Sequence, residues 1–241
     1  MSETERIFGK NAVLECLGSD QSINKIWISN HPHPRLKEIE EQARVKKIPL
    51  IKLEKKDLDR LANGADHRSV IAEIAPITIH EESFLEQAQI QKILIPVNIE
   101  DPHNLGAIIR TAYAFNIDAI VITKHKGSPV NETVISTSAG AALRLPIVRV
   151  TNIVSCIEKL KKNGFWIYGS NVSQDKSRDL YKLDFDKKSV ILVGNEGKGL
   201  SDNILKHCDF QIYIPIAFES LNVSVATGII LSKVYSSSYG F

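Results

Sequence analysis

The chain has 241 residues, with 30 Lys and Arg against 28 Asp and Glu, a formal net charge of +2, and 43% hydrophobic residues. This composition is typical of a globular protein of one or two domains and excludes a disordered, collagen-like or coiled-coil chain. No apolar run reaches the roughly 18 residues of a membrane span, and the start of the chain lacks the apolar segment of a signal peptide. We therefore expect a cytoplasmic protein without a membrane partner. The net charge neither requires nor excludes a nucleic-acid partner.

The cysteines and histidines do not form a metal-binding pattern. Cys16, Cys156 and Cys208 are far apart and form no CxxC pair, which argues against a zinc site or a disulfide framework and fits a reducing cytoplasm. His31 and His33 stand in an HPHP run, but a second pair of ligands is missing. We expect that run to be a loop that enters a helix, and we expect no metal.

Residues 1–75 predict a small α/β domain. The apolar spacing indicates three helices and three strands. The helices are expected at residues 10–17, from Pro34 through the following charged run, and at residues 57–63; the strands are expected at residues 23–29, 48–53 and 69–75. Residues 76–90, which begin with Pro76, are expected to be a linker with a short helix.

Residues 91–241 predict a second, larger domain with longer βα units. Strands are expected at residues 92–98, 117–123, 145–150, 165–170, 189–194 and 211–216, and helices at residues 104–116, 131–139, 152–162 and 221–235. Continuous apolar strands that alternate with helices indicate a parallel sheet covered on both faces. Ligands of such sheets bind in the loops at the carboxyl ends of the strands.

The first of three notable loops is NIEDPHNLGAIIRTAYAFN, residues 98–116. Asn104 is placed to cap a helix that contains Arg110, and the small Gly106 allows a ligand to approach the first turn. The alternative is a helix cap followed by an ordinary surface arginine.

A basic run, Lys124 to Lys126, follows the next expected strand and has two readings, an RNA phosphate contact or a solvated loop.

The second loop, VILVGNEGKGLSDNI at residues 190–204, joins a buried strand to a helix. Gly194, Gly197 and Gly199 permit close approach of the backbone to a ligand. The loop has neither of the usual phosphate-binding glycine spacings. Glu196 would also repel a phosphate, so a cationic or hydroxyl-bearing ligand fits better. The alternative is a tight glycine turn with an exposed glutamate.

The third loop, YIPIAFESLNVSVATGIIL at residues 213–231, also joins a strand to a helix. Ser220, Asn222 and Ser224 are polar residues in an otherwise apolar segment. The alternative to a functional role is that Ser220 caps the helix and that the other polar groups are satisfied locally.

In this order, NLGAIIRTA, GNEGKGL and IPI…ESLNVSVATG resemble the three motifs of the SpoU (TrmH-like) RNA ribose 2′-O-methyltransferases of the SPOUT superfamily. The resemblance covers roughly residues 91–238. The segments IFGKNAVLECL and DHRSVIAEIAP resemble the small RNA-binding domain of the RlmB subgroup, which is similar to ribosomal protein L30e and L7Ae folds. The resemblance implies an α/β fold with an RNA-binding domain at residues 1–75, a linker at 76–90, and a SPOUT parallel-sheet domain at 91–241 with a deep trefoil knot.

The resemblance also implies an activity and its partners. It implies a homodimer that transfers a methyl group from S-adenosylmethionine to a ribose 2′-OH of RNA, with a guanosine of 23S rRNA as the expected acceptor. Two alternatives stay open, a tRNA 2′-O-methyltransferase and a catalytically weakened RNA-binding relative that assists ribosome assembly. The implied cofactor-binding residues are Gly194, Gly197, Gly199, Ile214 and Leu221. The implied catalytic residues are Arg110, Asn104, Glu196, Ser220 and Asn222.

The chain departs from the family pattern in two places. The third motif, IPIAFESLN, is about two residues shorter than usual and has Phe218 where a small residue is expected. His67-Arg68-Ser69 replaces the usual H-Q-G, and Arg68 is placed to add a phosphate contact.

The role that the resemblance gives to Arg110 has two readings. Neutralising an ordinary arginine at pH 7 costs roughly 7–9 kcal/mol, so either the site makes it a base or it stays charged and stabilises the oxyanion.

Overall fold

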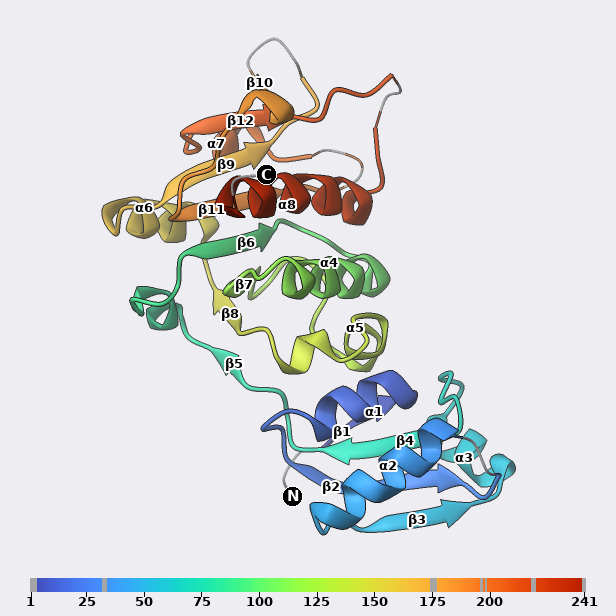
Figure 1. The fold of residues 1–241 in the computed structure, drawn as a ribbon. Coiled ribbons are helices and arrows are strands. Elements are labelled where there is room, and N and C mark those ends of the chain that lie inside the picture. Colours follow the sequence, from blue (N-terminus) through green and yellow to red (C-terminus); the bar gives the residue numbers. More distant parts are fainter. Residues whose placement is uncertain are drawn as a thin grey trace. The chain divides into compact units, whose positions relative to one another are not determined.

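The structure is a computed structural model that describes residues 4–31, 34–173, 177–195, 197, 199–217 and 220–239. The chain forms two compact units. Unit 1 consists of Met1–Thr78 and Val130–Arg144, and unit 2 consists of Ile79–Pro129 and Leu145–Phe241. Figure 1 shows the elements of both units along the chain.

Unit 1 is built on a four-stranded sheet in the order β1-β4-β2-β3. The strand β2 pairs with β3 in parallel, whereas the pairs β1–β4 and β2–β4 are antiparallel. The strands of this sheet are β1 (Glu5–Phe8), β2 (Ile23–Ser29), β3 (Leu50–Leu53) and β4 (Val70–Ile74). The helices of the unit are α1 (Lys10–Leu17), α2 (Pro34–Val45), α3 (Lys55–Ala62), α5 (Glu132–Thr137) and the 3-10 turn η2 (Ala141–Leu143).

A segment from the middle of the chain completes unit 1. The helix α5 packs against β1, and η2 packs against α1. Gly140, in a left-handed conformation with φ 90°, lets the backbone approach Glu15 so closely that a side chain would collide. The same glutamate forms a 2.7 Å ion pair with Arg144. Residues 130–144 are therefore part of the core of unit 1, although the chain on either side of them belongs to unit 2.

Unit 2 is built on an eight-stranded parallel sheet in the order β10-β12-β9-β11-β6-β7-β8-β5. Its strands are β5 (Ile79–His80), β6 (Lys92–Pro96), β7 (Ala119–Thr123), β8 (Ile147–Val150), β9 (Trp166–Ser170), β10 (Arg178–Asp179), β11 (Ser189–Val193) and β12 (Phe210–Tyr213). The helices are η1 (Glu82–Glu86), α4 (Pro102–Ala114), α6 (Ile153–Lys162), η3 (Leu180–Lys182), α7 (Asp202–Leu205) and α8 (Val223–Tyr239).

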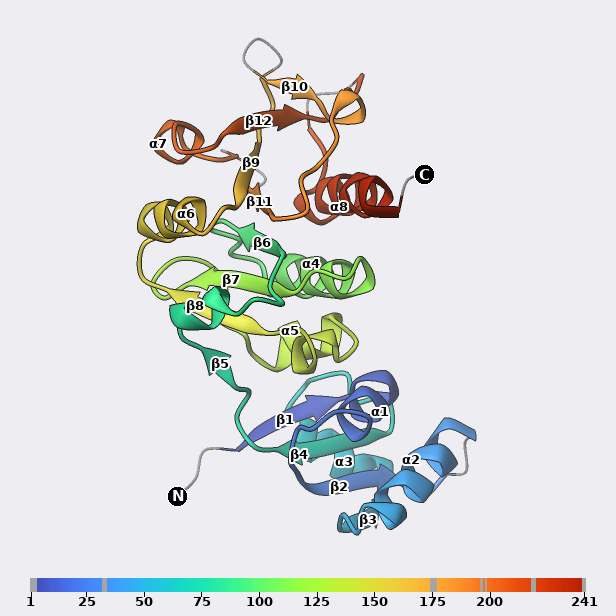
Figure 2. The ribbon, with the colours of Figure 1, turned by 60° about the vertical axis from the view of Figure 1, so that its left-hand side comes forward.

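Helices cover both faces of this sheet, as Figures 1 and 2 show. One face packs against η1, α6 and α7 in a continuous apolar cluster that includes Leu85, Ile157, Leu160 and Leu205. On the other face α4 and α8 pack side by side. Because the strands are buried on both faces, β11 reads as the unbroken apolar run that the sequence analysis associates with a parallel sheet.

The structure confirms most of the predicted elements, and it corrects three helix starts. The helix α3 begins at Lys55 rather than Asp57. The helix α4 begins at Pro102 rather than Asn104, because Asp101 accepts a 2.8 Å hydrogen bond from the backbone NH of His103 and caps the helix. The helix α8 begins at Val223 rather than Leu221. Residues 76–90 contain the expected short helix as η1, and β5 also joins the sheet of unit 2. The trefoil knot and the likeness of unit 1 to L30e stay predictions.

Two further features concern the helices and the cysteines. Among the described residues, no helix is long and apolar enough to cross a membrane. Burial raises the pKa of the Cys16, Cys156 and Cys208 thiols to about 12. Because a thiolate is the reactive form of cysteine, these three side chains are unsuited to nucleophilic chemistry at neutral pH.

Candidate functional site

The described part of unit 2 contains a pocket of about 340 Å³ at the carboxyl ends of β9, β11 and β12. Ser170, Val193 and Ile212 end or nearly end these three strands, and all three line the pocket. The pocket is completed by the loops after β11 and β12 and by Ala226 and Ile230 of α8. This is the edge of a parallel sheet where ligands are expected.

The loop after β11 forms one wall of the pocket. Gly194, Gly197 and Gly199 all line it, so the structure brings together the three glycines that the sequence analysis selected. The loop closes on itself, since the backbone NH of Gly199 donates a 3.0 Å hydrogen bond to the carbonyl of Asn195. A Cβ atom added to Gly194 would collide with the backbone of Gly199 and Leu200. Glycine at position 194 is therefore required for the loop to fold back.

The loop after β12 forms another wall of the pocket. Ile214, Ile216, Ser220 and Leu221 line the pocket, so residues of the second and third motifs face one cavity. Ser220 does not begin α8 as expected. Asn222 caps this helix instead, because its side-chain Oδ1 accepts hydrogen bonds from the backbone NH groups of Ser224 and Val225 at 2.9 and 3.4 Å.

Asn222 also connects the third motif to the first. Its Nδ2 donates a 3.1 Å hydrogen bond to Oδ1 of Asn104, a residue 118 positions earlier in the chain. Asn104 lies in the first turn of α4, and Thr111 further along this helix faces Gly228 of α8. The contact between the two helices thus joins two predicted catalytic residues at one end of the helix pair.

The two remaining predicted catalytic residues do not complete this arrangement within the described chain. Arg110 is exposed on α4 and is not among the residues that line the pocket. Its guanidinium forms no hydrogen bond, ion pair or ring contact with any residue that the structure describes. Glu196 lies outside the described residues, as does Phe218 in the shortened third motif.

Sequence reasoning missed one wall of the pocket. Ser170, Asn171 and Val172 line it at the end of β9, where the sequence contains no recognisable motif. Asn171 is held in place by two contacts to β12, a 2.8 Å backbone hydrogen bond to Ile212 and a 2.9 Å side-chain bond to Gln211. The only available signal was that these residues follow a strand whose carboxyl end faces the ligand edge.

The lining suits an organic ligand with both apolar and polar parts. Ile214, Leu221, Val223 and Ile230 supply an apolar surface, while the glycine loop supplies backbone polar groups. In the part of the chain that the structure describes, no three His, Cys, Asp or Glu side chains gather as they would around a metal ion. The pocket therefore has the features of a small-molecule site that orients its ligand with few polar groups.

Comparison with known families identifies the larger unit. The SpoU rRNA Methylase family matches residues 91–232, which include all three motifs. The chain belongs to this family. A second family, described as RNA 2′-O ribose methyltransferase substrate binding, matches residues 6–79.

Individual relatives agree with this assignment over the whole chain. The 23S rRNA (guanosine-2′-O-)-methyltransferase RlmB of Pseudomonas aeruginosa is 36% identical over 97% of this chain and 97% of its own. The RlmB protein of Xanthomonas campestris pv. campestris is 38% identical over 99% and 98%. The crystal structure of the SpoU methyltransferase AviRb from Streptomyces viridochromogenes in complex with AdoMet has a TM-score of 0.82 at 18% identity, covering 99% of this chain and 92% of that chain. This last likeness supports the fold.

Proposed function

We propose that this protein transfers a methyl group from S-adenosylmethionine to the ribose 2′-OH of a guanosine in 23S rRNA. The observation that carries the proposal is the pocket itself, where the second and third family motifs meet beside Asn104 of the first. Family membership and the names of the relatives, which cover nearly all of both chains, support the same activity.

The pocket fits S-adenosylmethionine. The backbone of Gly199 and Leu200 packs directly against Gly194, so no side chain at position 194 separates the backbone of the glycine loop from a ligand. Ile214 and Leu221 offer an apolar surface to an adenine ring. We assign Gly194, Gly197, Gly199, Ile214 and Leu221 to cofactor binding. When bound, S-adenosylmethionine supplies an electrophilic methyl group on a sulfonium. The chain must then present a ribose oxygen in line with that methyl group and stabilise the oxygen as its proton leaves.

We assign the orientation of the acceptor ribose to Asn104, Ser220 and Asn222. Ser220 lines the pocket, and Asn222 is fixed both by its cap of α8 and by its bond to Asn104. Glu196, in the same loop as the pocket glycines, joins this group by its position in the second motif. Because arginine remains protonated in water, we propose that Arg110 acts as a cation that stabilises the developing ribose oxyanion.

The position of Arg110 leads us to propose a homodimer. Its guanidinium is exposed on α4 and lacks a described partner, whereas the pocket is lined by other residues. Beside it, Tyr113 on α4 is 42% exposed, and Val225 on the adjacent α8 is 51% exposed. A second copy seated on this helix pair would cover both apolar side chains and could bring Arg110 to the partner's pocket.

We further propose a division of labour along the chain. Residues 1–75 bind the RNA substrate, residues 76–90 are the linker, and residues 91–241 carry out catalysis. The match of residues 6–79 to the substrate-binding family supports the first of these assignments. The free cysteines and an rRNA substrate are both consistent with a cytoplasmic location. The knot predicted for residues 91–241 would hold the two pocket loops together.

Methyl transfer to defined RNAs tests the proposed function. Purified protein is incubated with labelled S-adenosylmethionine and unmodified 23S rRNA or tRNA transcripts, and the methylated position is mapped. We expect one ribose-methylated guanosine in the 23S transcript. Transfer to tRNA alone would replace the substrate, and S-adenosylmethionine binding with no transfer to either RNA would favour an RNA-binding relative that has lost its activity.

A further inference from the structure

A short basic loop lies at the carboxyl end of β7, outside the pocket. Lys124, His125 and Lys126 follow Thr123, the last residue of that strand, and all three are exposed. We call these three residues the 124–126 loop. Neither the cofactor pocket nor the proposed catalytic residues include them.

The 124–126 loop is held firmly on its neighbours. The backbone NH of Lys124 donates a 2.9 Å hydrogen bond to the carbonyl of Val150, and the hydroxyl of Thr123 donates to the carbonyl of Lys126. The NH of Ser128 donates a 2.6 Å bond to the carbonyl of Ile99. Gly127, with φ 99°, passes so close that an added Cβ would lie 3.1 Å from that same carbonyl oxygen. The backbone of the 124–126 loop is therefore held beside the loop that leads into α4.

The order of the sheet places this loop in line with the active site. The pocket lies at the ends of β9 and β11, Asn104 follows the adjacent β6, and the 124–126 loop follows β7, the next strand along. Neighbouring strands are about 4.8 Å apart. A nucleic-acid strand with its acceptor ribose at Asn104 would thus reach the 124–126 loop with its adjoining phosphates.

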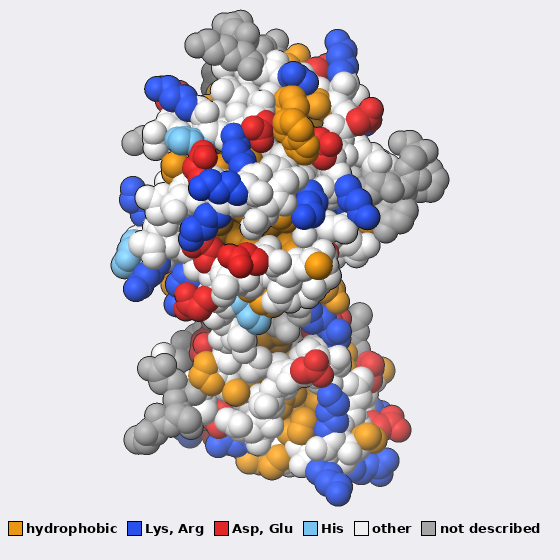
Figure 3. Space-filling model, turned by 90° about the vertical axis from the view of Figure 1, so that its left-hand side faces the viewer, with side chains coloured by type: hydrophobic (Ala, Val, Ile, Leu, Met, Phe, Trp, Pro, Cys, Tyr) orange, Lys and Arg blue, Asp and Glu red, His pale blue; other side chains and the backbone are white. Residues whose placement is uncertain are grey.

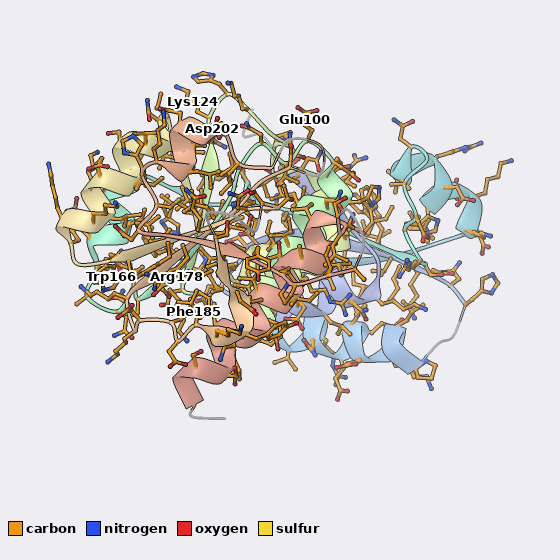
Figure 4. All side chains as sticks on the ribbon, turned by 90° about the horizontal axis from the view of Figure 1, so that it is seen from above. Glu100, Lys124, Trp166, Arg178, Phe185 and Asp202 are labelled. Carbon is orange, nitrogen blue, oxygen red and sulfur yellow. The ribbon has the colours of Figure 1, made fainter. Side chains whose placement is uncertain are left out.

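The charges of the loop are also available. The ammonium groups of Lys124 and Lys126 form no ion pair with any residue that the structure describes, and although Glu100 lies along the same margin in Figure 4, no ion pair joins it to Lys124. Lysines of α6 differ in this respect. Lys159 pairs with Glu82 at 2.7 Å and Lys161 with Asp209 at 2.8 Å, and Figure 3 shows basic and acidic side chains interspersed on that side of unit 2.

We infer that the 124–126 loop binds phosphate groups of the RNA strand that flanks the methyl-acceptor nucleotide. This inference rests on the proposed function, because it assigns part of the substrate to the same sheet edge. Phosphate contacts position a nucleic acid without reading its sequence. Lys124 and Lys126 are accordingly positioning residues that affect how tightly RNA is held rather than the methyl transfer itself.

The test compares two charge-matched double variants of the full chain. Lys124→Gln/Lys126→Gln removes two cations from the loop. Lys187→Gln/Lys206→Gln removes two exposed cations near the starts of β11 and β12, at the opposite end of the sheet. Binding of each protein to an unmodified 23S rRNA transcript is measured across a salt series. The affinity for S-adenosylmethionine is the control for folding, and steady-state kinetics of methyl transfer separates an effect on the KM for RNA from an effect on kcat.

Each phosphate contact that is lost from a single-stranded nucleic acid reduces the magnitude of the slope of log K against log salt concentration by about 0.7. The slope of the loop variant should therefore be smaller in magnitude than that of wild type by about 1.4. We also expect a higher KM for RNA with little change in kcat, and wild-type behaviour in the control variant. An unchanged slope in the loop variant, or an equal loss in both variants, would overturn the inference. Wild-type protein that binds this RNA but transfers no methyl group would instead refute the proposed function and leave the slope comparison valid.

Discussion

The glycine loop after β11 offers the sharpest single-atom test of the pocket, the substitution Gly194→Ala. The backbone of Gly194 does not need a left-handed conformation, so alanine is acceptable to its dihedral angles. The obstacle is space. An added Cβ would lie closer than 3.0 Å to the backbone of Gly199 and Leu200, and backbone atoms cannot move aside as a side-chain end can. The loop must therefore open.

The size of the effect follows from what opening removes. Overpacking by one carbon in a closed site costs about 1–3 kcal/mol, and the 3.0 Å hydrogen bond from Gly199 to Asn195 contributes about 1 kcal/mol. If this loss of about 2–4 kcal/mol falls on the cofactor-binding conformation, S-adenosylmethionine should bind about 25- to 700-fold more weakly, at about 1.4 kcal/mol per factor of ten. The same distortion lowers the free energy of unfolding if it persists in the ligand-free protein.

Gly197→Ala is the control for the steric effect on stability, because a Cβ added there meets nothing within 4 Å among the described residues. We expect its free energy of unfolding to stay within about 0.5 kcal/mol of wild type. Calorimetric titration with S-adenosylmethionine and urea unfolding of both variants decide the matter. Equal cofactor affinity for Gly194→Ala and wild type would refute the assignment of this loop to the cofactor.

Three further predictions concern the helix pair. Arg110→Ala should lower turnover by about 10²–10³ with cofactor affinity unchanged, and Arg110→Lys should rescue poorly; turnover within threefold of wild type would remove Arg110 from the mechanism. Asn222→Asp keeps the cap of α8 but loses the amide donor to Asn104, so kcat should fall while the free energy of unfolding is retained. Asn222→Ala should lower kcat and also lose about 1 kcal/mol of the free energy of unfolding, because the cap is removed. A kcat equal to that of wild type in both variants would contradict this role of Asn222. Light scattering should give twice the chain mass of 26.8 kDa, and mixing Arg110→Ala with Gly194→Ala protomers should restore activity if the arginine acts in the partner's site; a monomer would refute the dimer.

The parts of the fold that could be predicted are those that local chemistry determines. Helical spacing and an apolar run predicted α1 and β2 with their observed bounds, because α1 buries one face and the second half of β2 is buried. The start of α4 was also readable in principle. Asp101 followed by Pro102 is the usual pattern of a cap and a first helical residue, yet Asn104 two positions later competed for the same role. Where several residues can cap, packing decides.

The site was predictable only where a glycine or a motif marked it. The glycines of residues 194–199 stand out because few other residues could make that turn. The wall formed by Ser170 and Val172 could not be found, since only the sheet order places the end of β9 between β11 and β12. The same holds for the bond between Asn104 and Asn222, which requires α4 and α8 to pack together.

The excursion of residues 130–144 into unit 1 escaped prediction for the same reason, and it changes what a truncated chain should do. A fragment of residues 80–241 lacks β1 and α1, so α5 and η2 lose the surfaces on which they pack. Val134, Ile135, Ala141 and Ala142 are buried in the whole protein. Each of the two larger side chains gives up roughly 1.5–3 kcal/mol when it becomes exposed, which is enough to unfold a six-residue helix locally.

This local loss should leave the cofactor pocket intact, because every residue that lines it lies between Ser170 and Ile230 in unit 2. We therefore expect the fragment to bind S-adenosylmethionine within about threefold of wild type and to lose most salt-dependent RNA binding. Hydrogen exchange supplies the control: residues 130–144 should lose protection, whereas β11 and β12 keep theirs. Loss of cofactor binding with protection retained in β11 would show that unit 1 shapes the pocket. RNA affinity equal to that of the whole chain would mean that residues 1–75 do not bind the substrate.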